Sequence, residues 1–137
     1  MNSHLEITDD QFEEQFSNES FPAQHFSHEA HIRLAWIHLK KYGLDKAISN
    51  LTNQIRNFAN RNGAPDKYNV TITIAAIKAV RHFMLKSSTA EFESFIHENP
   101  RLVHSFKNLL DAHYSANGYT TNKAKTSYLE SDLLPFD

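Results

Sequence analysis

The fold is decided by the stretch LDKAISNLTNQIRNF, residues 44–58, which carries the clearest hydrophobic pattern in the sequence. Its apolar residues recur at intervals of three and four positions: Leu44, Ala47, Ile48, Leu51, Ile55 and Phe58. This spacing places them on one face of an α-helix, whereas a half-buried strand would alternate apolar and polar residues. The turn-forming residues Gly63-Ala64-Pro65-Asp66 follow. The sequence therefore predicts an amphipathic helix from Leu44 to about Asn62.

Helix start and stop signals flank this stretch on its N-terminal side. Thr8 and Gln11 have the spacing of a capping box, which predicts the start of a short helix. Ser27 suits the N-cap of a second helix that runs to about Tyr42 and stops at Gly43. We therefore expect two helices before Leu44, separated by a loop.

The segment that begins at Asn69 fits two structures. Val70, Ile72 and Ile74 alternate with polar residues, as they would in a strand. The alanine-rich continuation to Met84 instead favours a single helix of about 15 residues. An isolated strand would also find no obvious partner elsewhere in the sequence, so we expect the helix.

The C-terminal part carries further helix signals. A second capping box is expected at Ser88 and Glu91, and Asn99-Pro100 has the form of an N-cap followed by an N1 proline. A short helix is expected near residues 122–128. An extended tail, Leu133-Leu134-Pro135-Phe136, would follow it.

Composition agrees with one all-α domain. Hydrophobic residues make up 40% and charged residues 22%, which is usual for a globular protein. Three glycines and four prolines are few for a turn-rich β fold. A chain of 137 residues is long enough for one core and short for two. We expect a single helical domain over 1–137, with its core at about residues 8–130, built as a bundle of five to six helices.

Charge and composition also argue against several classes of protein. The formal net charge of −2 comes from dispersed acids and bases, so no nucleic-acid partner is expected. The absence of cysteine excludes disulfides, thiol catalysis and cysteine-based zinc sites. No apolar run approaches the roughly 20 residues that span a bilayer, and no signal-peptide pattern opens the sequence. We therefore expect no membrane partner and a cytoplasmic location.

Three of the nine histidines, His25, His28 and His31, lie within seven residues. Neutral imidazole is the commonest metal ligand and the usual acid or base near neutral pH. His28 and His31 are spaced i and i+3 on the helix that follows Ser27, so they share a face, which we expect to point to the core. The positive end of the helix dipole favours their neutral form. The competing interpretation is structural, with both rings bonded to neighbouring carbonyls, and the sequence leaves the two open.

Three motifs resemble those of a small bacterial all-helical family of uncharacterised proteins. The first is Phe26-x-His28-x-x-His31-Ile32-x-x-Ala35-Trp36, the second is Lys67-Tyr68-Asn69-Val70-Thr71-Ile72-Thr73, and the third combines Tyr114-Ser115, Ala124-Lys125 and Ser131-Asp132. The resemblance covers about residues 8–134. It implies an all-helical fold and supports the helix over residues 70–85.

The resemblance also bears on metal binding. In the family pattern a third histidine in the middle motif would complete an open three-imidazole site with His28 and His31. This sequence has Asn69 there, and asparagine is a weak ligand for zinc-like metals. Lys125 stands where the family has arginine, which keeps the charge and loses bidentate binding of an anion.

Two functions are consistent with the sequence. In the first, a soluble helical-bundle protein binds a small polar ligand without chemistry, in a pocket lined by His25, Tyr68, Asn69, Thr71, Tyr114 and Lys125. In the second, a metal-assisted enzyme uses His28 and His31 as ligands of a divalent metal ion and acts on a small polar substrate. Asn69 in the third ligand position favours the first. The apolar tail can pack onto a second copy in a homodimer or cover its own core.

Overall fold

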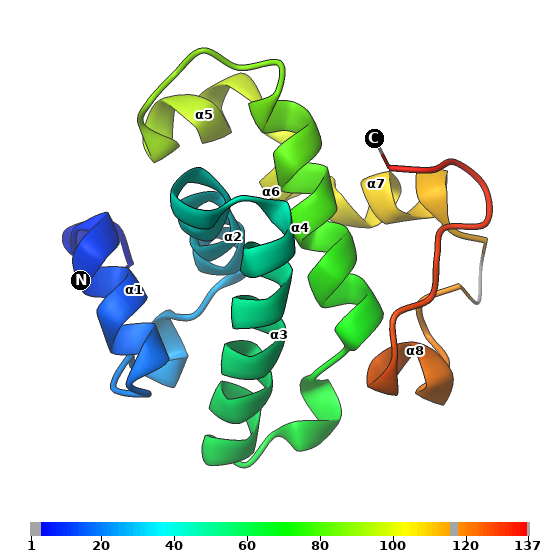
Figure 1. The fold of residues 1–137 in the computed structure, drawn as a ribbon, viewed down its shortest axis with the longest axis horizontal. Helices are drawn as coiled ribbons and strands as arrows, with labels where there is room; N and C mark the ends of the chain where they lie inside the picture. Colours follow the sequence, from blue (N-terminus) through cyan, green and yellow to red (C-terminus); the bar gives the residue numbers. More distant parts are fainter. Residues whose placement is uncertain (1–3, 116–117, 137) are drawn as a thin grey trace. The chain divides into compact units, whose positions relative to one another are not determined.

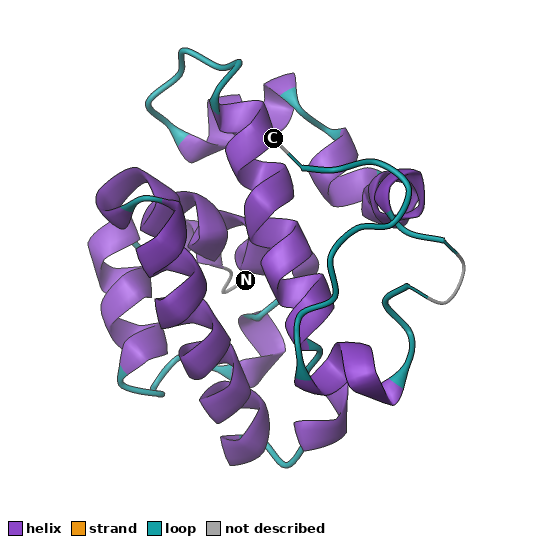
Figure 2. Cartoon of the chain, turned by 45° about the vertical axis from the view of Figure 1, so that its right-hand side comes forward, coloured by secondary structure: helices purple, strands orange, loops and turns teal. Residues whose placement is uncertain are grey.

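Every regular element of the described chain is helical. The computed structural model describes residues 4–115 and 118–136 and has no strand within them, as the ribbons of Figures 1 and 2 show. Eight α-helices and three short 3-10 helices lie in these two ranges. The all-α class is confirmed, and the expected number of five to six helices is too low. No helix of these ranges is long and apolar enough to cross a membrane.

The chain divides into two compact units, unit 1 over residues 1–68 and unit 2 over residues 69–137. Its length favours a single domain over 1–137, but the contacts cluster on either side of the bond between Tyr68 and Asn69. Each unit has its own helices and is described by itself.

Two long helices, α2 and α3, form the frame of unit 1. Its elements are η1 (His4–Glu6), α1 (Asp9–Ser17), η2 (Ala23–His25), α2 (His28–Tyr42), α3 (Leu44–Arg61) and η3 (Pro65–Lys67). Gly43 joins α2 to α3, which pack against each other, and its φ of +83° lies in the left-handed region that favours glycine. The helices predicted before and after Gly43 are both confirmed.

Side-chain caps mark where α1 and α2 begin. Thr8 Oγ1 accepts a hydrogen bond from Gln11 N at 3.1 Å, and Gln11 Oε1 accepts one from Thr8 N at 2.9 Å. The predicted capping box is therefore complete. Ser27 Oγ accepts a bond from Ala30 N at 3.1 Å and so caps α2, as predicted. These caps satisfy backbone donors that have no partner inside the helix.

Phenylalanine rings form much of the core of unit 1. The set is Phe12, Phe16, Phe21, Phe26 and Phe58, all buried or partly buried. The ring of Phe16 lies 4.7 Å from that of Phe58 and 4.9 Å from that of Phe26, measured between centroids. Phe12 packs on Phe21 at 4.8 Å. The contacts with Phe58 hold α1 and the loop that follows it onto α3.

Arg33, which is only 5% exposed, fastens the N-terminal segment to α2. Its guanidinium donates to Asp9 Oδ1 at 2.9 and 3.2 Å and to the carbonyl oxygen of Ile7 at 2.9 Å. It also donates to the carbonyl oxygen of His4 and lies over the ring of Phe12. A buried charge is tolerated only where its donors are satisfied, so these bonds define how the segment before α1 lies on α2.

Unit 2 is built on α4, and its elements are α4 (Val70–Met84), α5 (Phe92–Glu98), α6 (Arg101–His104), α7 (Phe106–His113) and α8 (Asn122–Thr126). Residues 70–84 are helical, so the helix prediction is confirmed and the strand interpretation is wrong. Asn69 caps α4, because its Oδ1 accepts a hydrogen bond from Ile72 N at 2.9 Å. The buried residues Ala75, Leu110, Tyr114 and Tyr119 form a core cluster, with Ile72, Phe106 and Phe136 packed against it.

Two helix predictions in unit 2 are wrong. The capping box expected at Ser88 does not form, and α5 begins at Phe92 with Glu91 in its N-cap position. The polar residues before it make their own turn instead, since Thr89 Oγ1 accepts a bond from Glu91 N at 3.3 Å. The helix expected after Pro100 is divided at Ser105, whose φ of −138° lies outside the helical region.

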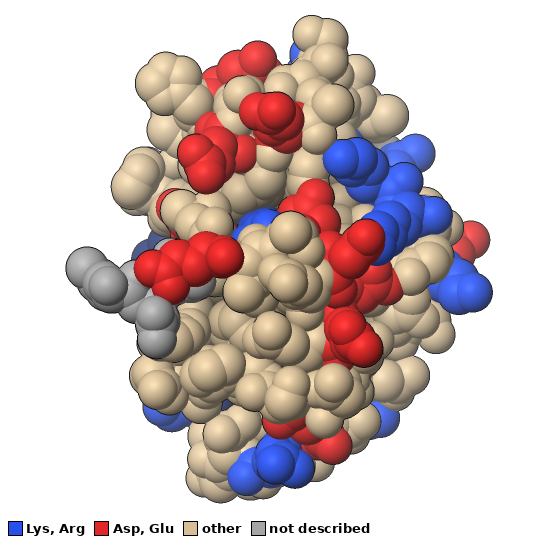
Figure 3. All heavy atoms as spheres, turned by 90° about the vertical axis from the view of Figure 1, so that its left-hand side faces the viewer, with Lys and Arg blue, Asp and Glu red and all other residues tan. Residues whose placement is uncertain are grey.

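Charges of both signs occupy the face drawn in Figure 3, which is the side of α1 in Figure 1. In unit 1, Lys41 Nζ donates to Glu13 Oε1 at 2.6 Å and also bonds Asp10. The hydrogen bond between Lys41 and Asp10 lowers the pKa of the Asp10 carboxyl and raises the pKa of the Lys41 amine. The pair of Lys41 with the exposed Asp10 contributes little to stability.

Candidate functional site

The histidine cluster lies in unit 1, at the start of α2. His25 ends η2, His28 is the first residue of α2, and His31 lies one turn further on. The rings of His28 and His31 are neighbours, with centroids 6.4 Å apart and planes at 84°. Their shared face is therefore confirmed. His28, however, is exposed, so the expectation that both point to the core is wrong for that residue, which is the first residue of α2.

His31 is partly buried, and its Nε2 atom is sealed from solvent with no hydrogen-bond partner among the described residues. Its ring lies 5.7 Å from that of Phe26. Burial, and to a lesser degree the charge of His28, lower the pKa of His31 to about 4. The ring is therefore neutral at physiological pH. The main cause is burial, whereas the sequence predicts the neutral form from the helix dipole.

The rings of His28 and His31 lie further apart than two imidazole ligands of a tetrahedral metal ion. Metal–nitrogen bonds of 2.0–2.1 Å bring two imidazole centroids to about 5 Å from each other when a tetrahedral ion joins them. His28 and His31 lie 6.4 Å apart. Within residues 4–115 and 118–136, no group of three or more His, Cys, Asp or Glu side chains is placed to hold a metal ion. Metal binding by this pair stays a prediction.

Three of the expected ligand-binding residues lie in unit 2 and bond backbone groups of Tyr119 and Leu129. Asn69 Nδ2 donates to the carbonyl oxygen of Tyr119 at 2.9 Å. Thr71 Oγ1 accepts from Leu129 N at 3.1 Å, and the Tyr114 hydroxyl donates to the carbonyl oxygen of Leu129 at 2.9 Å. These side chains thus hold the chain after α7 against α4.

The remaining expected residues, His25, Tyr68 and Lys125, are distributed over both units. His25 is partly buried in unit 1, with its ring 6.3 Å from that of Phe21. The Tyr68 hydroxyl donates to the carbonyl oxygen of Thr52 at 2.9 Å, which joins η3 to α3. Lys125 lies in α8 of unit 2 and is partly buried. Their binding roles stay predictions.

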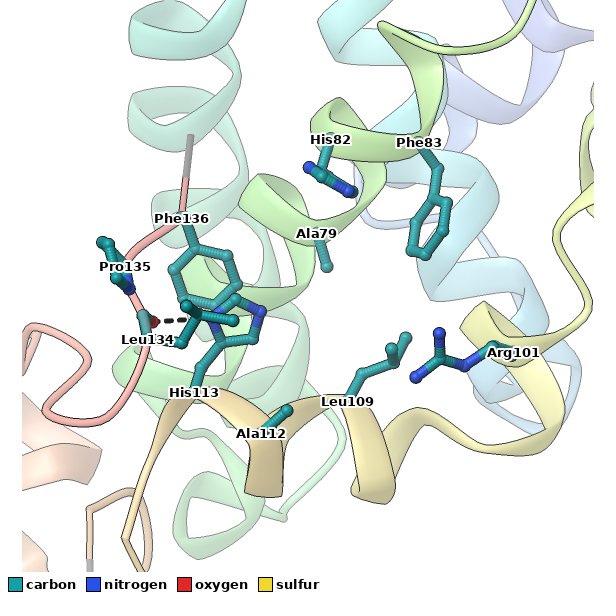
Figure 4. Close-up of a pocket in the computed structure, with 10 residues that line it drawn as sticks. All are labelled: Ala79, His82, Phe83, Arg101, Leu109, Ala112, His113, Leu134, Pro135 and Phe136. Carbon is teal, nitrogen blue, oxygen red and sulfur yellow. Dashed lines mark hydrogen bonds between the residues drawn. The ribbon is translucent and has the colours of Figure 1, made fainter.

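Unit 2 also contains a cavity of about 450 Å³ that the sequence does not reveal (Figure 4). Its walls come from α4, α6, α7 and the C-terminal tail. The lining residues are Ala79, His82, Phe83, Arg101, Leu109, Ala112, His113, Leu134, Pro135 and Phe136. Most of this lining is apolar, and none of the ten residues is acidic.

The polar groups of the cavity come from three lining residues, His82, Arg101 and His113. The guanidinium of Arg101 points toward Leu109 at one end of the cavity (Figure 4). At the other end His113 Nδ1 bonds the carbonyl oxygen of Leu134 at 2.7 Å. A carbonyl oxygen only accepts, so Nδ1 carries the hydrogen, and Nε2 of the neutral ring is an acceptor.

The sequence contains few signals that predict this cavity. His82 occurs singly in a predicted helix, His113 lies at a predicted helix end, and Arg101 follows a predicted helix start. Helical spacing brings residues of one helix together, but it does not indicate which helices face each other. The nearest signal is the apolar tail, for which covering its own core was one of two expectations. Phe136 does so in unit 2, since it is partly buried against the core cluster.

Comparison of the chain with protein-family models, with curated proteins and with solved structures gives no match.

Proposed function

We propose that the protein binds a small molecule without chemistry and that the ligand occupies the cavity of unit 2. The observation that carries this proposal is the cavity itself, with its volume of about 450 Å³. Ligand sites in proteins usually have volumes of about 300–1,000 Å³, with mostly apolar walls and a few polar groups that fix orientation. Arg101 and the two histidines are polar groups of that kind.

The hydrogen bonds of unit 2 support this site over the polar pocket expected from the sequence. Asn69, Thr71 and Tyr114 already bond the backbone of residues 119–129. A ligand that used these groups would have to replace bonds that hold unit 2 together. In the cavity, Arg101 and the Nε2 atom of His113 can bind a ligand while the bond from His113 Nδ1 to Leu134 is kept.

The test blocks the cavity at its edge. Ala112 lines the cavity and is exposed, so Ala112→Trp fills part of the space without overpacking the core. Ala23→Trp adds the same ring to an exposed position of unit 1 and serves as the matched control.

The probe is 2-phenylethanol, titrated against each protein and followed by NMR chemical shifts. We expect Ala112→Trp to weaken binding at least tenfold and Ala23→Trp to leave it unchanged. Equal affinity in all three proteins, or no binding to the unmutated chain, would contradict the proposal.

A second candidate, the metal-assisted enzyme, draws support from His31. Its neutral ring with an unpartnered Nε2 is competent to bind a metal, and His28 is its neighbour. The test is elemental analysis of protein purified without a histidine tag, together with His28→Ala and His31→Ala. About one equivalent of metal in the unmutated chain, lost in both variants, would support a metal site. Sub-stoichiometric metal in the unmutated chain would overturn this candidate.

A further inference from the structure

The cavity of unit 2 carries an unpaired positive charge at one end. Arg101 makes no ion pair or side-chain hydrogen bond within residues 4–115 and 118–136, and no acidic residue lines the cavity. Its guanidinium points along the wall toward Leu109 (Figure 4). A planar guanidinium pairs in bidentate fashion with a carboxylate. The charge at this end therefore matches a ligand with a carboxylate group.

The opposite end offers an acceptor. His113 donates through Nδ1 to Leu134, and its other ring nitrogen faces the space enclosed by the lining residues (Figure 4). In the neutral ring this nitrogen accepts a hydrogen bond. An ammonium group would suit it poorly, because the cavity already holds the charge of Arg101 and no acid. A neutral hydroxyl is the donor that fits.

Flat side chains also belong to the lining, and one of them, Phe136, stacks on His113. Phe83 comes from α4, and Pro135 and Phe136 come from the tail. Aromatic rings pack against such surfaces in offset or edge-to-face arrangements, which add to the energy of burial. The body of the ligand is therefore expected to be aromatic.

We infer that the ligand of this cavity is an aromatic carboxylate that carries a hydroxyl group at its far end. Arg101 binds the carboxylate, and His113 accepts the hydrogen bond of the hydroxyl. This inference rests on the proposed binding function and adds the chemical class of the ligand.

Four probes separate the two polar contacts. They are 4-hydroxyphenylacetate, phenylacetate, 2-(4-hydroxyphenyl)ethanol and 2-phenylethanol, which combine an acid or an alcohol with the presence or absence of the ring hydroxyl. Dissociation constants are measured by NMR titration. We expect each acid to bind about tenfold more tightly than its alcohol, and each hydroxylated probe to bind several-fold more tightly than its parent.

Two variants assign these preferences to residues. Arg101→Gln should abolish the preference for acid and keep the preference for hydroxyl. Arg61→Gln, at an exposed position of α3, removes the same charge and should change neither. His113→Asn keeps a donor near Leu134 and removes the inward acceptor, so it should abolish only the preference for hydroxyl.

The outcomes distinguish the inference from the proposed function. If 2-phenylethanol binds and Ala112→Trp blocks it, while acids bind no better than alcohols, the binding function stands and the ligand class is wrong. If the acid preference survives in Arg101→Gln, the role of Arg101 is overturned. If none of the four probes binds the unmutated chain, both the inference and the proposed function fail.

Discussion

The imidazole of His113 lies flat on the ring of Phe136, with centroids 3.9 Å apart and planes at 16°. The same histidine bonds the carbonyl oxygen of Leu134. The two contacts hold the tail against the end of α7 and make it a wall of the cavity. Residues more than twenty positions apart thereby build one wall of the cavity, and this wall depends on a few residues of the tail.

Truncation of Phe136 should weaken this wall. Phe136→Ala removes the stacking on His113 and the contact with the core cluster. Since Phe136 is only partly buried, we expect the free energy of unfolding to fall by about 1–2 kcal/mol. Chemical denaturation measures this change, and titration with 2-phenylethanol should show weaker binding. Leu133→Ala, at a position that is 59% exposed, is the control and should change neither quantity.

Thr71 should be important for the stability of unit 2. Its Oγ1 donates to the carbonyl oxygen of Ser127 and accepts from Leu129 N, both at 3.1 Å. Thr71→Val keeps the shape of the side chain and leaves both backbone groups unpaired, which we expect to cost about 1–3 kcal/mol. Thr120→Val, at an exposed position, should cost almost nothing. An equal loss of stability in both variants, measured in urea, would show that the bonds of Thr71 contribute nothing.

Replacement of Arg33 by lysine should disrupt unit 1 although the charge is kept. Lysine cannot reach Asp9 and the carbonyl oxygens of His4 and Ile7 together, because it lacks the planar fork of arginine. We expect Arg33→Lys to lower the free energy of unfolding by about 2–4 kcal/mol. Arg61→Lys, at an exposed position of α3, is the matched control. Hydrogen exchange of α1 should accelerate only in Arg33→Lys.

The buried imidazole of His31 should make unit 1 less stable in mild acid. Burial holds its pKa at about 4, below the ordinary value of 6.5. The unfolded chain therefore takes up the proton first as the pH falls, so the stability is complete above about 6.5 and is lost progressively down to about 4. The loss amounts to at most about 3 kcal/mol. Burial also lowers the pKa of His38, which adds to the same trend.

His31→Leu isolates this contribution. We expect the urea midpoint of this variant to fall less between pH 7.5 and pH 4.5 than that of the unmutated chain. Gln24→Leu adds a similar apolar side chain at an exposed position and should keep the original pH dependence. Identical pH profiles in all three proteins would show that His31 does not titrate as its burial indicates.

Local signals in the sequence predict much of the secondary structure. Thr8 and Ser27 cap the helices as expected, and the spacing from Leu44 to Phe58 gives α3. These signals succeed because a cap or a helical face depends on neighbours within a few residues. They fail at Ser88, where Thr89 forms a competing turn with Glu91, and at Ser105, where the backbone leaves the helical region between two short helices.

The candidate site is harder to predict, because its residues are brought together by packing. The histidine cluster is visible in the sequence, and the structure confirms that His28 and His31 are neighbours. Thr71 and Tyr114 look like ligand contacts in the sequence, yet both bond the backbone of Leu129. The cavity depends on how the tail returns to α4 and α7, and periodicity contains no information on that.

The location of a bound probe tests the central proposal most directly. Intermolecular nuclear Overhauser effects between 2-phenylethanol and methyl groups of the protein report which side chains the ring touches. We predict contacts with the methyl groups of Ala79, Leu109 and Ala112, which line the cavity of unit 2. Contacts confined to Ala30 and Ile32, beside the histidines of α2, would contradict the account.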